Sequence, residues 1–285
     1  MRSRRLLVAA ALVVVGAGCN FPEMIPQGDA PLRYRDQVFT SVVESPGITY
    51  GSAKNLSNQT VTLKLDMYEP PSSDTITRRP AIVWVHGGSF CCGDKTATEI
   101  TDEANHFAME GYVSASINYR LEPGGCTASS PTQTCISAIK EAREDAQTAV
   151  RFLRANAATY GIDPTRIAIA GTSAGAITAL EVGYSTAENP TSAVRAAVSL
   201  SGANILSTIG AGDAPALLFH GTLDTIVPYQ WAVNTVNAAK AAGLDVFLES
   251  WDGAGHVPYA QFRDQILTQT TNFLWWEMNL THAAK

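Results

Sequence analysis

The chain has 285 residues, of which 46% are hydrophobic and 16% charged, so it can bury one large core and needs no second domain. Its 20 basic and 26 acidic residues give a formal net charge of −6, and no basic stripe favours nucleic-acid binding. Beyond the N-terminal segment, no apolar run is long enough to span a membrane.

The first nineteen residues have the pattern of an export signal. Three arginines lie within Met1–Arg5, an apolar stretch covers Leu6–Val15, and Gly16-Ala17-Gly18 precedes Cys19. These small residues resemble a bacterial lipobox, although Gly16 stands where leucine is usual. We therefore expect export and a lipid on Cys19 that anchors the protein to a membrane. The alternative is a secretory peptide with a cysteine near its cleavage site, which leaves a secreted or periplasmic protein.

The rest of the chain predicts a tether and then one folded domain. Residues 20–33 contain three prolines and are expected to form the tether, with the domain over residues 34–285. Alternating apolar and polar residues over 37–50 and 60–68 predict antiparallel strands at the entry to a sheet. Strands near 81, 113, 167, 195, 216 and 246 then alternate with helical patterns near 98–110, 137–157, 174–185, 229–242 and 258–278. This order predicts an α/β fold with a doubly wound, mostly parallel sheet.

A sharp turn is predicted at Gly171-Thr172-Ser173-Ala174-Gly175. The β-branched run Ile167–Ala170 precedes it, and the alanine-rich stretch Ala176–Val182 follows it. In such a strand–turn–helix the glycines let the chain reverse tightly, which exposes the serine Oγ above the sheet. A turn of small residues in an ordinary strand–helix connection would show the same five letters. The flanking strand and helix therefore carry the prediction that Ser173 is a nucleophile.

Three further segments each follow a predicted strand. His86–Phe90, with the letters HGGSF, could expose backbone amides to an oxyanion. Asp224 stands just beyond the apolar run Ala216–Phe219, and His256 stands just beyond the run Val246–Trp251. The chain order of serine, aspartate and histidine, with an HGG turn upstream, is that of α/β-hydrolases rather than of chymotrypsin or subtilisin.

On these residues the chain resembles the α/β-hydrolase superfamily, and in particular the bacterial carboxylesterases that include feruloyl and acetylxylan esterases. The resemblance covers about residues 60 to 277. It is carried by the segments LDMYEP at 65–70, HGGSF at 86–90, INYRL at 117–121, GIDPTRI at 161–167, GTSAG at 171–175 and HGTLDTIVP at 220–228. The resemblance implies an α/β-hydrolase fold with antiparallel N-terminal strands, and residues 34–285 as the catalytic domain.

The resemblance also implies a role for each site residue. Ser173 is carried over as the nucleophile, His256 as its general base and Asp224 as the acid that orients the imidazole. A neutral hydroxyl is a poor nucleophile, so it needs an imidazole to take its proton, and backbone N–H groups stabilise the oxyanion that forms. Those donors are expected to be the amides of Gly88, Ser89 and Ala174.

Several neighbouring residues have weaker assignments. Asp252, four residues before His256, is the rival for the orienting acid. His86 is expected to be a structural part of the HGG turn, and His220 to cap a strand end by hydrogen bonding. Two departures from the family pattern are Thr172 in the sharp turn and the pair Cys91-Cys92 after HGGSF. The remaining residues that we expect to have ordinary structural positions are His106, His282 and the pair Trp275-Trp276 of a packed terminal helix.

Four cysteines remain beyond Cys19, and export would permit disulfides among them. Cys126 and Cys135 bracket a polar segment and suit a local loop closure. Links from Cys91 or Cys92 to Cys126 or Cys135 are also sensible, because neighbouring strand ends share one rim of the sheet. The sequence leaves these pairings open. The spacing matches no zinc pattern, so no metal and no cofactor are expected.

The interval between Leu200 and Ala216 holds only about fifteen residues, which leaves no room for a large helical lid. An open site suits short-acyl or polymer-borne esters. We therefore expect a serine carboxylesterase that hydrolyses short-acyl or carbohydrate-linked esters through an acyl-enzyme, with the ester as its partner and its oligomeric state open. The alternatives are a peptidase, thioesterase or polyester depolymerase on the same fold, and a non-catalytic surface binding lipoprotein.

Overall fold

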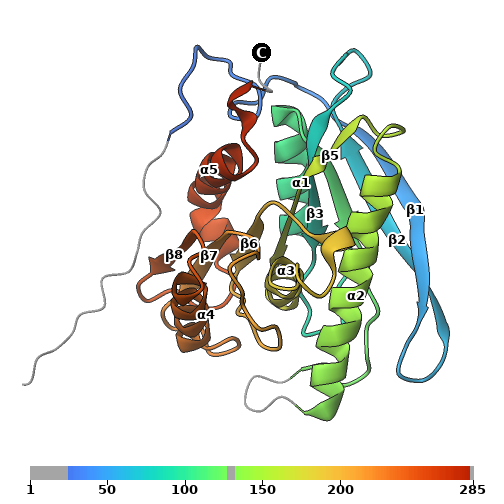
Figure 1. Cartoon of the computed structure of the whole chain (residues 1–285), viewed down its shortest axis with the longest axis vertical. Helices are drawn as coiled ribbons and strands as arrows, with labels where there is room; N and C mark the ends of the chain where they lie inside the picture. Colours follow the sequence, from blue (N-terminus) through green and yellow to red (C-terminus); the bar gives the residue numbers. More distant parts are fainter. Residues whose placement is uncertain (1–24, 127–131, 283–285) are drawn as a thin grey trace, which may run out of the picture.

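The structure, a computed structural model, describes residues 25–126 and 132–282 (Figure 1). The predicted export signal and the proposed lipidation site at Cys19 lie outside the described residues. The strands are β1 (Val43–Lys54), β2 (Thr60–Glu69), β3 (Arg79–Val85), β4 (Val113–Ile117), β5 (Ile162–Thr172), β6 (Ala197–Leu200), β7 (Ala216–Gly221) and β8 (Val246–Trp251). They form one sheet in the order β1-β2-β4-β3-β5-β6-β7-β8.

The sheet is antiparallel at one edge and parallel elsewhere. β2 pairs antiparallel with both β1 and β4, and every pair from β4 to β8 is parallel. The parallel strands are short apolar runs because helices cover both of their faces, and all seven residues of β3 are buried. The predicted α/β-hydrolase fold, including its antiparallel N-terminal strands, is confirmed.

In the described part of the chain, five α-helices cover the sheet (Figure 1). The bounds of these helices are α1 (Thr98–Glu110), α2 (Gln133–Ala155), α3 (Ala174–Gly183), α4 (Tyr229–Ala241) and α5 (Tyr259–Glu277). One apolar core joins α2, α3 and α4 to one face of the sheet, and a second core joins α1 and α5 to the other. In the last helix Trp275 is packed at 1% exposure, whereas Trp276 is 43% exposed.

Several element bounds differ from the predicted ones, and two of these differences have a local reason. The second helix begins at Gln133 instead of near 137, because the Thr132 hydroxyl accepts a hydrogen bond from Cys135 N at 3.1 Å and caps it. The first strand begins at Val43 instead of near 37. The backbone N–H groups of Val38 and Phe39 donate to the carbonyl of Met109 near the end of α1 rather than to the sheet.

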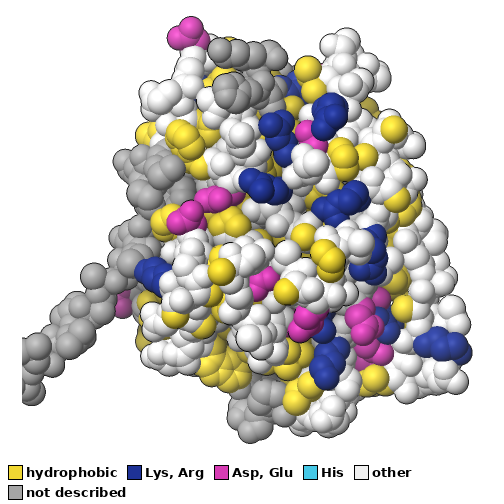
Figure 2. Space-filling view, viewed as in Figure 1, with side chains coloured by type: hydrophobic (Ala, Val, Ile, Leu, Met, Phe, Trp, Pro, Cys, Tyr) yellow, Lys and Arg dark blue, Asp and Glu magenta, His cyan; other side chains and the backbone are white. Residues whose placement is uncertain are grey.

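The segment before the first strand lies on the domain. Arg33 forms an ion pair with Asp74 at 2.6 Å, and Tyr34 is fully buried with its ring edge-on to Tyr112. On the face seen in Figure 2, basic and acidic side chains are interspersed and do not gather into a basic stripe. No helix within residues 25–126 and 132–282 combines the length and hydropathy needed to cross a membrane.

Candidate active site

Ser173 lies at the tip of the turn between β5 and α3. Its backbone has φ 53° and ψ −115°, a conformation that costs free energy and is found mainly at functional sites. Two close approaches explain the flanking glycines. A Cβ on Gly171 or Gly175 would lie 2.5 Å or 1.9 Å from the carbonyl oxygen of Val85, so only glycine lets the turn pack on β3. The turn therefore holds the hydroxyl above the C-terminal end of β5.

Asp224 and His256 complete a hydrogen-bonded chain with Ser173. The Ser173 Oγ lies 2.8 Å from His256 Nε2, and His256 Nδ1 lies 2.7 Å from Asp224 Oδ2. A carboxylate only accepts hydrogen bonds, so Nδ1 carries the hydrogen and Nε2 can accept the serine proton. Because β7 and β8 are neighbours, the loops after them bring Asp224 and His256 together. Asp252 instead accepts a hydrogen bond from Thr222 Oγ1 at 3.2 Å.

Four donors surround the Asp224 carboxylate. Oδ1 accepts the backbone N–H groups of Ile226 and Val227 at 2.9 and 3.0 Å. Oδ2 faces His256 and, at 3.2 Å, the Nε2 of His220. Burial by itself would raise the pKa of Asp224, but the hydrogen bonds from His220 and His256 hold it well below its usual range. The carboxylate is therefore ionised whenever His256 is able to act as a base.

His220 does more than cap a strand end, because it also contacts Asp224. It is fully buried, its Nε2 lies 2.8 Å from the carbonyl oxygen of Val227, and the same nitrogen faces Asp224. Both neighbours accept, so Nε2 carries the hydrogen, while Nδ1 has no partner among the described residues. The ring of Tyr229 packs edge-on against this imidazole. His220 thus helps to fix the position of the Asp224 carboxylate.

Ser201, which supports this group of residues, was not predicted from the sequence. Ser201 follows β6, the strand between those that carry the nucleophile and the acid, and its backbone has φ 59°. Its Oγ accepts the N–H of Val257, next to His256, at 3.0 Å. Leu200 accepts the N–H of Ser173 at 2.9 Å. The only sequence signal was a serine at the end of an apolar run, which is too common to single out.

The turn after β3, which we call the oxyanion turn, comprises residues 86–93. Gly88, Ser89 and Phe90 all have positive φ, of 114°, 52° and 62°. The segment after β4 holds this turn in place, since Cys126 N donates to the Ser89 carbonyl at 2.8 Å and Glu122 N donates to the Phe90 carbonyl at 2.9 Å. Within the described residues, no hydrogen bond to a protein acceptor is donated by the N–H groups of Gly88, Ser89 or Ala174.

His86 begins the oxyanion turn and is buried. Its Nδ1 lies 2.6 Å from the carbonyl oxygen of Gly87, and its ring stacks on Tyr119 with centroids 4.5 Å apart. Burial lowers the pKa of His86, so the ring is neutral at physiological pH. Tyr119 Oη also donates to the His86 carbonyl at 3.1 Å. These contacts fit the predicted structural role and keep His86 away from the hydroxyl of Ser173.

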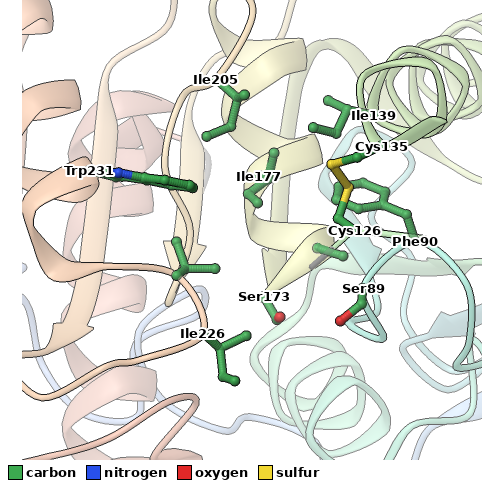
Figure 3. A pocket seen from close by; sticks show the side chains of 12 residues that line it. Ser89, Phe90, Cys126, Cys135, Ile139, Ser173, Ile177, Ile205, Ile226 and Trp231 are labelled. Carbon is green, nitrogen blue, oxygen red and sulfur yellow. A yellow bond between two sulfur atoms is a disulfide. The ribbon is translucent and has the colours of Figure 1, made fainter. Parts of the chain in front are cut away.

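An apolar pocket opens beside Ser173 (Figure 3). Ser173 and Ser89 lie together at one end, with Trp231 on one wall and the disulfide on the opposite wall (Figure 3). The residues that line the pocket are Ser89, Phe90, Cys126, Cys135, Ile139, Ser173, Ala174, Ile177, Ile205, Ile226, Val227 and Trp231. A pocket with so few polar groups suits a hydrocarbon rather than a charged ligand.

A buried carboxylate of α3 sets one part of this wall. Glu181 is fully buried and accepts the N–H groups of Ile205 and Leu206, both at 2.7 Å, and the hydroxyl of Ser207 at 2.6 Å. These bonds hold the loop between β6 and β7, which contains no helix, against α3. The expected absence of a helical lid in this interval is thus matched by a short anchored loop that places Ile205 in the pocket.

The structure resolves the cysteine pairing that the sequence leaves open. Cys126 and Cys135 form a disulfide with Cα atoms 4.6 Å apart. Cys91 and Cys92 are thiols, so neither is linked to the other two. Within residues 25–126 and 132–282, no group of three or more His, Cys, Asp or Glu side chains is arranged to hold a metal ion.

Comparison with known proteins finds a matching family model and solved structures of esterases. A family model described as BD-FAE matches residues 65–204. The propionate-bound structure of Est2, a thermophilic esterase from the Planctomycetes species Thermogutta terrifontis, is 26% identical with a TM-score of 0.63, over 83% of this chain and 93% of that chain. The paraoxon-phosphorylated structure of esterase 2 from Thermogutta terrifontis is 25% identical with a TM-score of 0.67, over 81% and 93%.

Among curated proteins, the phenmedipham hydrolase of Pseudarthrobacter oxydans is 35% identical over 99 residues, which cover 34% of this chain and 18% of that protein. The chain spans 18% to 39% of the length of the first curated relatives that it matches. Fold, strand-end geometry and sequence similarity agree: the chain has the α/β-hydrolase fold and is similar to carboxylesterases over about half of its length.

Proposed function

We propose that this protein is a serine carboxylesterase that hydrolyses esters of short acyl chains through an acyl-enzyme intermediate. The observation that carries the proposal is the continuous hydrogen-bonded chain from Ser173 through His256 to Asp224, with distances of 2.8 and 2.7 Å, at the mouth of an apolar pocket. No residue of the chain needs to move for the hydroxyl to lose its proton to the imidazole.

The proposed reaction has two steps that share the same groups. His256 Nε2 takes the proton of Ser173 as Oγ attacks the ester carbonyl, and the imidazolium is stabilised by the Asp224 carboxylate. The tetrahedral oxyanion accepts hydrogen bonds from the N–H groups of Ser89 and Ala174, with Gly88 as the third candidate donor. His256 then protonates the leaving alcohol. In the second step it deprotonates a water that attacks the acyl-enzyme, and Ser173 regains its proton.

The pocket side of Ser173 is assigned to the acyl chain. Its walls are aliphatic and aromatic and include Ile177, Ile205 and Trp231. Two structures of the Thermogutta terrifontis esterase, 26% and 25% identical to this chain, are propionate-bound and butyrate-bound, which supports a short acyl group here. We expect the alcohol side to be open, because the loop 201–215 between β6 and β7 contains no helix that could form a lid. That openness favours bulky alcohols such as carbohydrates.

Export and membrane attachment are part of the proposal, and they rest on the sequence of the first nineteen residues. An exported esterase anchored through Cys19 would meet polymer-borne esters outside the cytoplasm. Replacement of Cys19 by serine should move the protein from the membrane fraction to the soluble fraction after cell lysis. A Cys19→Ser protein that still partitions into membrane would exclude the lipid anchor.

The first test is a substrate series on the purified protein. We expect hydrolysis of p-nitrophenyl acetate, propionate and butyrate with a decline for longer chains, and a loss in kcat of about 10⁵-fold or more in Ser173→Ala. The variant should keep the circular dichroism spectrum and the Tm of the wild type. Acetylated xylan and feruloylated oligosaccharides then test the alcohol side. Hydrolysis of thioesters or anilides with no hydrolysis of any oxygen ester would overturn the carboxylesterase assignment.

A further inference from the structure

Two neighbouring thiols lie at the back of the oxyanion turn. Cys91 is partly buried and Cys92 is exposed, and their Sγ atoms are 2.8 Å apart. The other two described cysteines already form a disulfide with each other. The mechanism proposed above uses neither thiol, and neither lines the acyl pocket. An adjacent dithiol that is open to solvent can react with small thiol reagents.

The peptide that joins the two cysteines is packed directly on the oxyanion turn. The backbone N–H groups of Cys91 and Cys92 both donate to the Gly88 carbonyl at 3.0 Å, and Cys91 Sγ lies 3.4 Å from the same oxygen. A Cβ on Gly88 would lie only 2.1 Å from the carbonyl oxygen of Cys92. Any change in the backbone at 91–92 must therefore move Gly88, and with it the N–H of Ser89.

We propose that Cys91 and Cys92 form a reversible dithiol–disulfide pair whose oxidation distorts the oxyanion turn and lowers the turnover of the adjacent site. The effect on turnover rests on the esterase function proposed above. The oxidant is a small-molecule disulfide of the glutathione class. Cys92 thiolate attacks it, forms a mixed disulfide and releases one thiolate. Cys91 thiolate then attacks the Cys92 sulfur, forms the Cys91–Cys92 bond and releases the second thiolate, and the two protons pass to the released thiols.

Covalent geometry explains why oxidation would reach the backbone. Disulfide-bonded cysteines usually have Cα atoms about 4.4 to 6.8 Å apart, whereas adjacent residues are only about 3.8 Å apart across a trans peptide. The Cys126–Cys135 pair falls within the usual range at 4.6 Å. A ring between adjacent cysteines does not, so it strains the peptide between them. Strained, exposed disulfides are readily reduced, which suits a reversible pair.

The two thiols have different positions and so different parts in the reaction. Cys92 is exposed and can be reached by a soluble disulfide. The hydrogen bond with Cys92, together with burial, raises the pKa of Cys91. Cys91 is therefore held as the protonated partner until Cys92 has reacted, when it becomes the resolving thiol.

The test uses the whole protein treated with oxidised glutathione. Trypsin releases Arg79–Lys95, which contains both thiols, and Leu121–Lys140, which contains the structural disulfide. We expect the first peptide to lose the mass of two hydrogen atoms without gaining glutathione, while the second is unchanged. Turnover of p-nitrophenyl butyrate should fall at least about fivefold, in line with a weakened oxyanion donor, and recover with a mild reductant.

Two single variants separate the steps. Cys92→Ser should keep the turnover of its own reduced form in the presence of the oxidant. Cys91→Ser should instead gain one glutathione on Cys92, because the resolving thiol is missing. A wild-type peptide that carries only glutathione adducts, or that remains a dithiol, would overturn the pairing. A disulfide that forms without any change in turnover would overturn the coupling to the site.

The mass readout stands apart from the esterase assay. If the reduced protein hydrolyses no ester, the proposed function has failed, and the redox pair is still decided by the peptide masses. Its coupling to the turn is then decided by hydrogen exchange. Oxidation should accelerate exchange of the Cys91 and Cys92 amides, which are bonded to Gly88 in the reduced state. Unchanged exchange after complete oxidation would overturn the coupling.

Discussion

The two sides of Ser173 are built in different ways. On the oxyanion side, backbone groups make the contacts: Cys126 N donates to the Ser89 carbonyl, and Gly88 packs on the carbonyl of Cys92. On the acid–base side, side chains make them, since the Asp224 carboxylate joins His256 and His220. One side therefore depends on the shape of the chain and the other on charge and tautomer. We therefore expect a change of backbone shape to be most damaging on the oxyanion side, and a change of charge or tautomer to be most damaging on the acid–base side.

The difference follows from what each side has to do. An oxyanion develops only in the transition state, so its donors must be fixed in advance, and backbone N–H groups in a rigid turn achieve this without a charged side chain. The imidazole must instead gain and lose a proton in each cycle, so it needs a partner whose charge does not change. The pKa of Asp224 is held well below its usual range, which provides that partner.

Among substitutions on the two sides of Ser173, the largest effect is expected from a change of charge on the acid–base side. Asp224→Asn keeps the size of the side chain but offers an N–H where His256 needs an acceptor, so the imidazole adopts the wrong tautomer. We expect kcat to fall about 10⁴-fold near pH 7 with little change in KM. Steady-state kinetics with p-nitrophenyl butyrate measures this.

The matched control is Asp252→Asn, four residues before His256 on the same loop. Its carboxylate bonds Thr222 and not the imidazole, so we expect kcat within about threefold of the wild type, as for a surface substitution. If Asp252→Asn were the more damaging variant, the assignment of the acid would be wrong and the comparison between the two sides would lose its basis.

A change of shape on the oxyanion side should have the next largest effect. Gly88 has φ +114°, and a Cβ there would lie 2.1 Å from the Cys92 carbonyl oxygen. Gly88→Ala must therefore shift the turn and the N–H of Ser89. The loss of one oxyanion donor typically lowers kcat by about 10²- to 10³-fold, and we expect a loss of that size.

Gly212→Ala serves as its control, because a Cβ at Gly212 meets no atom within 4 Å and its φ is not positive. This variant should keep its kcat. Stopped-flow measurement of the acylation burst would show whether Gly88→Ala slows acyl-enzyme formation itself. A normal burst in Gly88→Ala would mean that the turn does not place an oxyanion donor.

The disulfide links the pocket to the oxyanion side, and its removal should have a smaller effect. Cys126→Ala with Cys135→Ala opens a loop with a sequence separation of 9, which should lower the free energy of unfolding by about 2 to 3 kcal/mol. The pocket wall opposite Trp231 would also lose its sulfur atoms, so the preference among acyl chains should move toward longer ones. Denaturant unfolding and the chain-length series measure the two effects separately. Unchanged chain-length preference would show that the disulfide does not bound the acyl site.

The sequence predicted most of the fold because its strands and helices have clear signals. α1 spans 98–110 as expected, since a helical apolar pattern ends at Gly111, which takes the left-handed C-cap conformation. The strand before Ser173 was predicted from Ile167 to Ala170, but β5 begins at Ile162. Asp163 and Pro164 hid that extension, because these residue types normally mark turns.

The triad residues could be predicted because each follows an apolar run and carries a reactive side chain. Their supports could not. Glu181 is separated from Ile205 by 24 residues, and nothing local marks a carboxylate that will accept two backbone N–H groups. His220 precedes Asp224 by four residues, yet its contact with the carboxylate depends on how the chain turns after β7. Long-range hydrogen bonds of this kind are decided by packing and leave no periodic pattern.

The smallest effect concerns charges beneath the oxyanion side. Arg120 forms ion pairs with Asp145 at 2.8 Å and with Glu141 at 3.3 Å, below the segment whose Glu122 N–H holds the Phe90 carbonyl. Burial and the neighbouring Glu122 carboxyl raise the pKa of Glu141 to about 7. Glu141 therefore binds a proton more tightly in the folded protein than in the unfolded chain.

The sign of the resulting pH dependence follows from this raised pKa. The folded state binds the proton more tightly than the unfolded state, so the stabilisation is fully present below about pH 4.5 and is lost as the pH rises toward 7. After allowance for partial solvent exposure, we expect the free energy of unfolding of the wild type to fall by about 1 to 2 kcal/mol more than that of Glu141→Gln over this interval. Urea unfolding at a series of pH values gives the difference between the two proteins, which cancels other titrating groups such as Glu277. If the two proteins give parallel curves of unfolding free energy against pH, the proton on Glu141 does not stabilise the fold beneath the oxyanion side. If the curves diverge as expected, that proton does stabilise it.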